Sequence, residues 1–300
     1  MMKKALTVFT PAYNRGYIIK NCYDSLCRQT CKDFVWLVVD DGSTDNTADL
    51  IKEWQKNDNG FEIRYIYKEN GGMHTAHNTA YENIDTELNV CVDSDDYMTD
   101  DAVEKIINCW NECKSNRLAG IIALDINPNG KVIGKELPAG ITETTLIGYY
   151  ENGGAGDKKL IYRTDVINSV PPYPVFEGEK YVGLAYKYHL VDKKYKLHIL
   201  NEPVCVVEYQ EDGSSMNMYR QYLNNPKGFA FLRKTEMLCT GSKKRCFIEC
   251  IHYVSSSIIS KNKHFINESP KKFLTVCAIP FGIALTVLIK KKSKSFMKVN

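Results

Sequence analysis

The sequence predicts an α/β fold in which a mostly parallel sheet is flanked by helices. Short runs of β-branched and aromatic residues alternate with amphipathic helical stretches through the first hundred residues. A polar turn rich in aspartate, asparagine and glycine follows the predicted strands. Because parallel strands need long crossover connections that place helices over the sheet, this alternation indicates a parallel sheet covered on both faces.

The regular part of this pattern contains four strands and three helices. Residues 5–10 and 34–39 are continuous apolar runs, which is typical of buried strands. Residues 17–29 carry apolar side chains at helical spacing, and Ser43 stands at the expected N-cap of the next helix. The predicted strands are residues 5–10, 34–39, 63–67 and 88–92, and the predicted helices are residues 17–29, 44–56 and 75–83.

The pattern is less regular after Asp96. We expect helices at 101–113, 181–191 and 218–238, the last broken at Pro226, strands at 120–124, 197–200 and 204–209, and loops in the glycine-rich stretch 147–157. No internal repeat or low-complexity linker divides the sequence. We therefore expect one domain with two halves, residues 1–115 and an irregular 116–240, followed by a helical appendage at 241–300.

The composition indicates a folded protein without affinity for nucleic acid. The 300 residues are 44% hydrophobic and 25% charged, which is ordinary for a globular chain. The formal net charge of +3 is small for this length, so no nucleic-acid partner is expected.

The eleven cysteines are expected to be reduced thiols packed as small apolar side chains. We expect no signal peptide, because no continuous apolar h-region, the hydrophobic core of such a peptide, precedes the polar stretch 10–15. The pairs Cys109/Cys113 and Cys246/Cys250 are each one helical turn apart, and neither is expected to have a histidine partner. The sequence therefore predicts no zinc site.

The segment 273–289 is apolar and is flanked by lysines at 271–272 and 290–292. As a helix it would be about 25 Å long, short of a hydrocarbon core of about 30 Å, and Pro280 and Gly282 interrupt its middle. This favours a segment at 271–298 that lies in the membrane interface, with the lysines at the headgroups, over a clean crossing. The alternative is a core helix of the globular domain.

Polar turns follow the four regular strands. They are residues 10–15 (TPAYNR), 40–43 (DDGS), 69–72 (ENGG) and 93–96 (DSDD). Ligands of open α/β sheets bind beyond the carboxyl ends of the strands. Carboxylates from two neighbouring strand ends would repel one another without a cation, and such oxygens suit Mg²⁺ or Mn²⁺.

A metal bound together with a phosphorylated ligand fits this pattern. Neither GxxxxGK[ST] nor a GxGxxG after the first strand is present, so we expect the phosphate to be bound by a metal and not by a glycine-rich loop. The alternative for each turn is ordinary turn and cap chemistry. For Asp40 this means capping the helix that follows.

Four segments together resemble the family 2 glycosyltransferases, which have the GT-A fold: TPAYNR at 10–15, VVDDGSTDNT at 38–47, KENGGMHTAHN at 68–78 and VCVDSDDYM at 90–98. The resemblance covers roughly the first 115 residues. It implies an inverting, metal-assisted transfer of a hexose or N-acetylhexosamine from a UDP-sugar to a glycan acceptor. The acceptor would be a glycan or a polyprenyl-linked oligosaccharide of polysaccharide biosynthesis, and the basic apolar segment at 271–298 favours the lipid-linked form. Residues 1–115 would bind the nucleotide sugar, and 116–240 would bind the acceptor and supply the base.

The resemblance also implies roles for single residues. Asp41 would accept the imide proton of uracil, and Asp95 or Asp96 would be the direct ligand to Mn²⁺ or Mg²⁺. His77 is expected at the helix surface or the edge of the core. The residues expected around the nucleoside diphosphate are Thr10, Ala12, Tyr13, Asn14, Arg15, Asp41, Asn70, His74, Asn78, Asp93, Ser94 and Asp95.

An inverting transfer needs a general base, and Glu179 is the first candidate and Glu177 the second. Many relatives carry Glu-Asp here, whereas Lys180 takes the second position in this sequence. The alternative is a carboxylate that favours the start of the next helix. Many members also use a histidine near two serines in the closing region 201–215, where this sequence has none. Asp212 or Ser215 would have to replace it.

Two other functions share part of this pattern. A nucleotidyltransferase also uses paired carboxylates, but TPAYNR lacks the glycines of its phosphate loop. A catalytically degenerate nucleotide-sugar-binding protein would explain the missing Glu-Asp pair and histidine. For the favoured function we expect a cytoplasmic enzyme that is peripheral on the inner face of the cell membrane.

Overall fold

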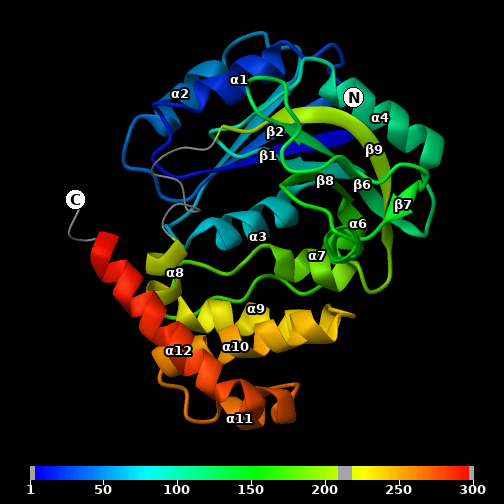
Figure 1. Cartoon of the computed structure of the whole chain (residues 1–300). Helices are drawn as coiled ribbons and strands as arrows, with labels where there is room; N and C mark the ends of the chain where they lie inside the picture. The colour runs from blue at the N-terminus through cyan, green and yellow to red at the C-terminus, as the bar shows by residue number, and fades with distance from the viewer. Residues whose placement is uncertain (1–3, 209–217, 297–300) are drawn as a thin grey trace. The chain divides into compact units, whose positions relative to one another are not determined.

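The structure is a computed structural model, and it describes residues 4–208 and 218–296. The chain divides into two compact units. Met1–Pro172 and Lys194–Tyr209 form the sheet unit, and Tyr173–Lys193 and Gln210–Asn300 form the helical unit. Figure 1 shows the sheet unit from blue to green and most of the helical unit from yellow to red.

The sheet unit is built on one mixed sheet with the strand order β3-β2-β1-β4-β8-β6-β9-β5, and β7 pairs with β9. β1 is parallel to β2 and to β4, and β2 is parallel to β3, so the predicted parallel sheet is confirmed for the first four strands. β8 is antiparallel to both of its neighbours. The strands are β1 Leu6–Ala12, β2 Phe34–Asp40, β3 Glu62–Tyr67, β4 Leu88–Cys91, β5 Tyr97–Met98, β6 Leu118–Ile126, β7 Glu143–Thr144, β8 Lys158–Arg163 and β9 Lys196–Val206.

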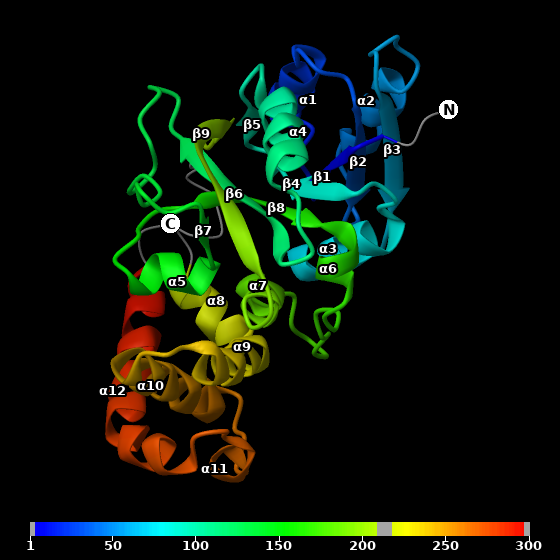
Figure 2. The ribbon, with the colours of Figure 1, turned by 90° about the vertical axis from the view of Figure 1, so that its right-hand side faces the viewer.

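Helices cover both faces of this sheet, as predicted (Figure 2). On one face Trp36 of β2 lies in a core with Tyr23 and Trp54, and the rings of the latter two stack 4.2 Å apart. On the other face Phe9 of β1 packs edge-on against His77. The helices on the first face are α1 Lys20–Cys27, α2 Thr47–Trp54 and α4 Ala102–Cys113, and those on the second are α3 Met73–Asn83 and α6 Thr164–Asn168.

Three local predictions are wrong. The expected loop at 147–157 contains α5 (Leu146–Glu151), because Thr145 caps it by accepting a hydrogen bond from the amide of Gly148. The two strands expected at 197–200 and 204–209 are the single strand β9, whose register shifts along β6. Ser43 is not an N-cap, since α2 begins at Thr47.

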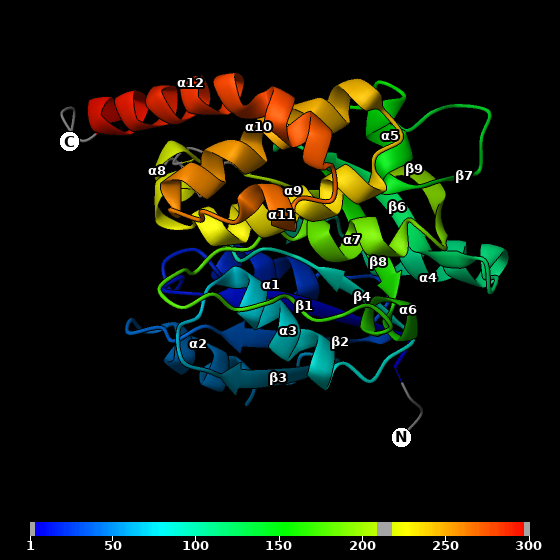
Figure 3. The ribbon, with the colours of Figure 1, turned by 90° about the horizontal axis from the view of Figure 1, so that it is seen from below.

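The described elements of the helical unit are helices: α7 Ala185–Val191, α8 Met218–Asn224, α9 Pro226–Cys239, α10 Lys243–Ile259, α11 Phe265–Glu268 and α12 Lys272–Phe296. The predicted break at Pro226 is confirmed, and the proline begins α9. α9 and α10 lie side by side (Figure 3). Arg233 of α9 joins them, because its guanidinium bonds the buried carboxylates of Glu236 at 2.7 Å and Glu249 at 2.8 Å.

α12 is a continuous helix, so the expected interruption at Pro280 and Gly282 is wrong. Its buried face is mostly small or polar, and a Cβ atom on Gly282 would overlap the side chain of Val254 in α10. Its opposite face is apolar and exposed. The buried residues are Thr275, Ala278, Gly282, Thr286, Ile289 and Ser293, and the exposed apolar residues include Phe273, Val276, Phe281, Ile283, Val287 and Leu288.

This pattern is the reverse of a helix on a water-soluble core, which buries its large apolar side chains. Small residues at the contact and large apolar residues outside are typical of helices that pack in lipid. Within the described residues, Lys272–Ser293 is one stretch long and apolar enough to cross a membrane by length and composition.

A glycine in the centre of the sheet provides a test of this packing. Gly120 of β6 has a φ of +147°, and a Cβ atom there would overlap the carbonyl oxygen of Ile161 in β8. We predict that Gly120→Ala lowers the free energy of unfolding by about 3 kcal/mol, because it adds backbone strain and a clash in a packed sheet. Urea denaturation measures the change.

The control is Gly130→Ala. Gly130 has a φ of +76°, but a Cβ atom added to it would have no neighbouring atom within 4 Å. The cost of this substitution should be about 1 kcal/mol, from the left-handed backbone alone. Equal losses in the two variants would contradict the close approach of β6 and β8.

Candidate functional site

The polar turns after β1 to β4 begin at the same edge of the sheet, because these four strands are parallel (Figure 1). Backbone hydrogen bonds join neighbouring strand ends. The amide of Asp41 donates to the carbonyl of Ala12 at 2.8 Å, and the amide of Lys68 donates to that of Asp40 at 2.9 Å. The polar ends of these strands therefore form one continuous edge.

The β1 turn is fastened to the β2 turn. Asn14 has a φ of +52°, its amide donates to Ser43 Oγ at 2.8 Å, and its Oδ1 accepts from the amide of Thr44 at 2.8 Å. The amide of Arg15 donates to Thr47 Oγ1 at 3.0 Å. These bonds hold the backbone of the turn in one conformation.

The side chains around this turn differ in what they offer to a ligand. Tyr13 is 49% exposed, whereas Ala12 is buried at the end of β1. Thr10 is buried, and its hydroxyl accepts a hydrogen bond from the indole of Trp36 at 3.0 Å. The hydroxyl of Thr10 thus faces the core.

Asp41 joins the β2 turn to the β3 turn. Its buried carboxylate accepts hydrogen bonds from the amides of Gly71 at 3.0 Å and Gly72 at 2.7 Å, and from Asn70 Nδ2 at 3.3 Å. The ammonium of Lys68 forms an ion pair with it. The charge of Asp41 is therefore compensated within the protein.

The two histidines of α3 lie in different surroundings. His74 is 1% exposed, and neither ring nitrogen has a hydrogen-bond partner among the described residues. Burial lowers the pKa of His74 to about 4, against the opposing effect of Asp41, so its imidazole is neutral at pH 7. A buried polar ring without partners is unusual in a folded protein and suits a ligand contact.

His77, in contrast, belongs to the core. It is fully buried, and its Nε2 lies 3.7 Å from the Sγ atom of Cys91. The sequence-based expectation of a helix-surface or core-edge position underestimates its burial. Asn78, one residue on, is half-buried.

The acidic turn 93–96 follows β4. The amide of Asp96 donates to the carbonyl of Asp93 at 3.0 Å, which closes the turn. Asp93 and Asp95 are half-buried, whereas Ser94 and Asp96 are buried. Burial raises the pKa of Asp96 to about 7, against the opposing charge of Lys159. The turn offers several carboxylate oxygens, which are the ligands of hard divalent cations.

Sequence reasoning missed two residues beside this turn. The ammonium of Lys159 in β8 is buried, 3.9 Å from Asp96 Oδ2 and 3.7 Å from Oδ1 of Asp125 in β6. Burial raises the pKa of Asp125, and neighbouring carboxylates hold the pKa of Lys159 well above its usual value in spite of burial. Asp125 directly follows the strand predicted at 120–124, as Asp93 follows its own strand, so the same rule would have found it.

The expected cluster of carboxylates from two neighbouring strand ends is wrong, because β1 lies between β2 and β4. Asp40 is fully buried, and its oxygens accept from the amide of Ser43 at 2.8 Å and the hydroxyl of Tyr65 at 2.7 Å. Asp40 therefore stabilises its own turn and does not cap a helix. The acidic group of this edge consists of Asp93, Asp95, Asp96 and Asp125.

The two candidate bases lie in the helical unit. Glu179 accepts hydrogen bonds from the amides of Lys227 at 2.9 Å and Gly228 at 2.8 Å, so it caps α9. It is not in the first turn of the next helix, since α7 begins at Ala185. Glu177 is exposed. The possible replacements for the missing histidine, Asp212 and Ser215, lie outside the described residues.

Curated proteins with similar sequences are glycosyltransferases. The chain is 39% identical to glycosyltransferase GlyA of Streptococcus pneumoniae over 101 residues, which are 34% of this chain and 14% of that protein. It is 33% identical to hyaluronan synthase of Pasteurella multocida over 128 residues, which are 43% of this chain and 13% of that protein. The chain thus spans only a small part of the length of these relatives.

Solved structures share the fold over nearly the whole chain. Residues 1–349 of S. aureus TarS in complex with UDP-GlcNAc match with a TM-score of 0.66 and 17% identity, over 99% of this chain and 92% of that chain. Mannosyltransferase PcManGT from Pyrobaculum calidifontis in complex with GDP-Man and Mn²⁺ matches with a TM-score of 0.54 and 14% identity, over 100% and 80%. The GT-A-type α/β fold expected from the sequence is confirmed.

The family model "Glycosyl transferase family 2" matches residues 7–167, which lie within the sheet unit and include all four polar turns. The match extends over more than half of the chain, in agreement with the relatives and with the fold. The chain therefore belongs to glycosyl transferase family 2.

Proposed function

We propose that this glycosyltransferase moves a hexose or N-acetylhexosamine from a UDP-sugar to a glycan acceptor, with inversion and with a divalent metal. The observation that carries the proposal is the acidic turn 93–96 at the carboxyl edge of the parallel strands, beside the turns after β1 and β2. Family membership favours this activity over a nucleotidyltransferase or a degenerate binding protein. The UDP-GlcNAc in the TarS complex supports a uridine nucleotide.

The residues of the acidic turn fit Mn²⁺ or Mg²⁺. Asp95 is half-buried and would be the direct ligand, and Asp96 would be the second. Because the pKa of Asp96 is raised to about 7, its carboxyl group is protonated in part of the molecules at neutral pH. A cation that binds there would displace this proton. When bound, the metal would neutralise the charge that grows on the diphosphate as it leaves the sugar.

The turns after β1 to β3 would hold the nucleotide. The exposed ring of Tyr13 suits stacking on a base, and Asp41 would reach the uracil imide only by sharing an oxygen that already accepts protein hydrogen bonds. The neutral ring of His74 would donate to the diphosphate, which would satisfy one of its two nitrogens. Asn14, Arg15, Asn70, Asn78, Asp93 and Ser94 complete the proposed donor site.

The general base in this proposal is Glu177, although the sequence favours Glu179. Both carboxylate oxygens of Glu179 already accept hydrogen bonds from backbone N–H groups of α9, which leaves them less open to an acceptor hydroxyl. Glu177 is exposed and can approach an acceptor hydroxyl. Glu179 would then act by holding the start of α9.

The exposed face of α12 supports contact with a membrane and an acceptor linked to a polyprenyl lipid. Because α10 covers one face of α12, only the opposite apolar face is open to lipid. Such a helix lies on the bilayer surface and does not span it alone. Exposed lysines at 271–272 and 290–292 would contact anionic headgroups on the inner face of the cell membrane.

The donor and the metal can be tested together. We predict that purified protein releases nucleoside diphosphate slowly from one UDP-sugar, and not from GDP- or TDP-sugars, only with Mn²⁺ or Mg²⁺. Asp95→Ala should lower this rate about 100-fold, because it removes charge stabilisation of the leaving group. The control is Asp58→Ala, at an exposed carboxylate. Equal rates in EDTA and Mn²⁺ would contradict the metal.

The two glutamates can be separated by rate and stability. We predict that Glu177→Gln lowers the transfer rate about 100-fold without changing the melting temperature, because it removes the base alone. Glu179→Gln should lower the free energy of unfolding by about 1 kcal/mol, because it weakens a helix cap. Glu136→Gln, at an exposed glutamate, is the control. The reverse result would assign the base to Glu179.

Membrane contact is tested by vesicle flotation. We predict that wild-type protein floats with vesicles that contain anionic phosphatidylglycerol, and that Ile283→Glu with Val287→Glu lowers the bound fraction at least tenfold. Both side chains are exposed on α12, away from the residues that it buries against α10. Val175→Glu, at an exposed valine outside α12, should float like wild type. Undiminished flotation of the double variant would refute the contact.

A further inference from the structure

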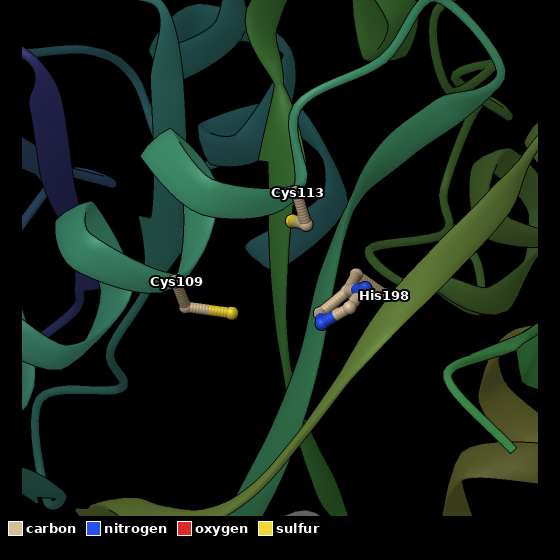
Figure 4. Close-up of side chains that lie close together, drawn as sticks. All are labelled: Cys109, Cys113 and His198. Atoms are coloured by element: carbon tan, nitrogen blue, oxygen red, sulfur yellow. The ribbon is translucent and has the colours of Figure 1, made fainter.

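Three soft or borderline ligand groups meet in the sheet unit, away from the acidic turn. The Sγ atoms of Cys109 and Cys113 and a ring nitrogen of His198 all lie within 4.8 Å of one another (Figure 4). The sequence predicts no zinc site, because no histidine is near this cysteine pair along the chain. The fold brings a histidine to this pair, because β9 packs against α4.

The backbone explains why the three side chains converge. Cys109 and Cys113 are four residues apart in α4, so both lie on the same face of the helix. All eleven cysteines lie within the described residues, and none is in a disulfide. His198 is in β9, which packs against α4. Two rigid elements thus hold the three groups.

The spacing is close to that of a zinc site. Zinc binds cysteine sulfur at about 2.3 Å and histidine nitrogen at about 2.0 Å in a tetrahedron, which sets these ligand atoms about 3.5 to 3.8 Å apart. From a separation of 4.8 Å or less, side-chain rotations that move the atoms by about 1 Å bring them to that geometry. All three residues are half-buried, so an ion can reach them from solvent.

Carboxylates and lysines both surround the two thiols, and Glu202 lies 3.3 Å from the ammonium of Lys105. Burial, followed by Cys113, raises the pKa of Cys109 to about 12, and the carboxylates of Glu112 and Glu202 act in the same direction. Burial also raises the pKa of Cys113, and Glu112 and Glu143 add to it. Both thiols are therefore protonated in the absence of a metal, and a bound ion would have to displace their protons.

Glu143 is also placed as a neighbour of His198. The two residues are direct partners in the antiparallel pair of β7 and β9, so their side chains are on the same face of the sheet. The carboxylate of Glu143 lies 3.6 Å from the ammonium of Lys196. Because Lys196 is exposed, a metal ion can replace it as the partner of Glu143.

We propose that Cys109, Cys113 and His198 bind a zinc ion, with Glu143 or water as the fourth ligand. Both thiols lose their protons to solvent as the Zn–S bonds form, and no electron is transferred. Thiolate and imidazole ligands select zinc over the hard cations that suit the acidic turn. The ion would join the end of α4 to β9 and so stabilise the sheet unit.

The experiment uses the full chain, stripped of metal and kept reduced. Zn²⁺ is titrated against a chromogenic chelator, and Co²⁺ is added separately as a spectroscopic probe of thiolate ligands. We expect one tight zinc per chain, a rise in melting temperature with zinc, and a thiolate-to-cobalt absorption band. Cys109→Ser, Cys113→Ser and His198→Gln should each weaken zinc binding at least tenfold, and each serine variant should reduce the band.

Two controls make the result specific. Cys246→Ser breaks a cysteine pair with the same spacing in α10 and should leave zinc binding unchanged. Asp95→Ala should also keep the zinc, since that residue belongs to the acidic turn. His198→Gln is at a half-buried position and tests the site even where a cysteine variant is unstable.

Three outcomes would overturn the proposal. They are no stoichiometric zinc at micromolar concentration in the folded wild-type chain, loss of zinc in Asp95→Ala, and unchanged zinc affinity in all three ligand variants. Sugar transfer is not needed for any of these readouts, so failure of the proposed function would leave them intact.

Discussion

The parallel pairing of β1 with both β2 and β4 is the constraint on which the site depends. It fixes the ends of three strands at one edge, and β3 adds a fourth through β2. The four polar turns therefore begin at the same edge of the sheet. The turns are then joined by side chains, Asn14 between the first two and Asp41 between the next two. Backbone hydrogen bonds between the strand ends and side-chain hydrogen bonds between the turns hold this edge together.

The acidic residues at this edge fall into two groups, which differ in how their charge is compensated. Asp40 and Asp41 are neutralised or fully bonded by Tyr65, Lys68 and backbone amides, and they act as structural joints. The carboxylates around Asp96 share the buried ammonium of Lys159, which leaves more negative charge than one lysine compensates. Burying such a group is costly without a further cation. The distinction separates the residues that build the edge from those that can serve a ligand.

The sequence predicted what local patterns encode. Short runs rich in apolar and β-branched residues identified β1 to β4, and the turn residues identified the edge and the family. β8 was missed because its sequence, KKLIYR, begins with two lysines, and the partners that bury Lys159 come from distant strands. The approach of His198 to Cys109 has the same cause, since pairing between β6 and β9 is not visible in either segment alone. The apolar character of α12 was evident, but which face it buries depends on α10.

Gly282 ties the packing of α12 closely to that of α10. The missing side chain lets this helix lie close enough to α10 for Thr286 to donate a hydrogen bond to Ser255 at 2.9 Å. A shortened chain ending before α12 would uncover Val254 and its neighbours, so a soluble fragment cannot be made by simple truncation. Solubility is better sought by replacing the outward side chains with polar ones, which leaves the hydrogen-bonded seam between the two helices untouched.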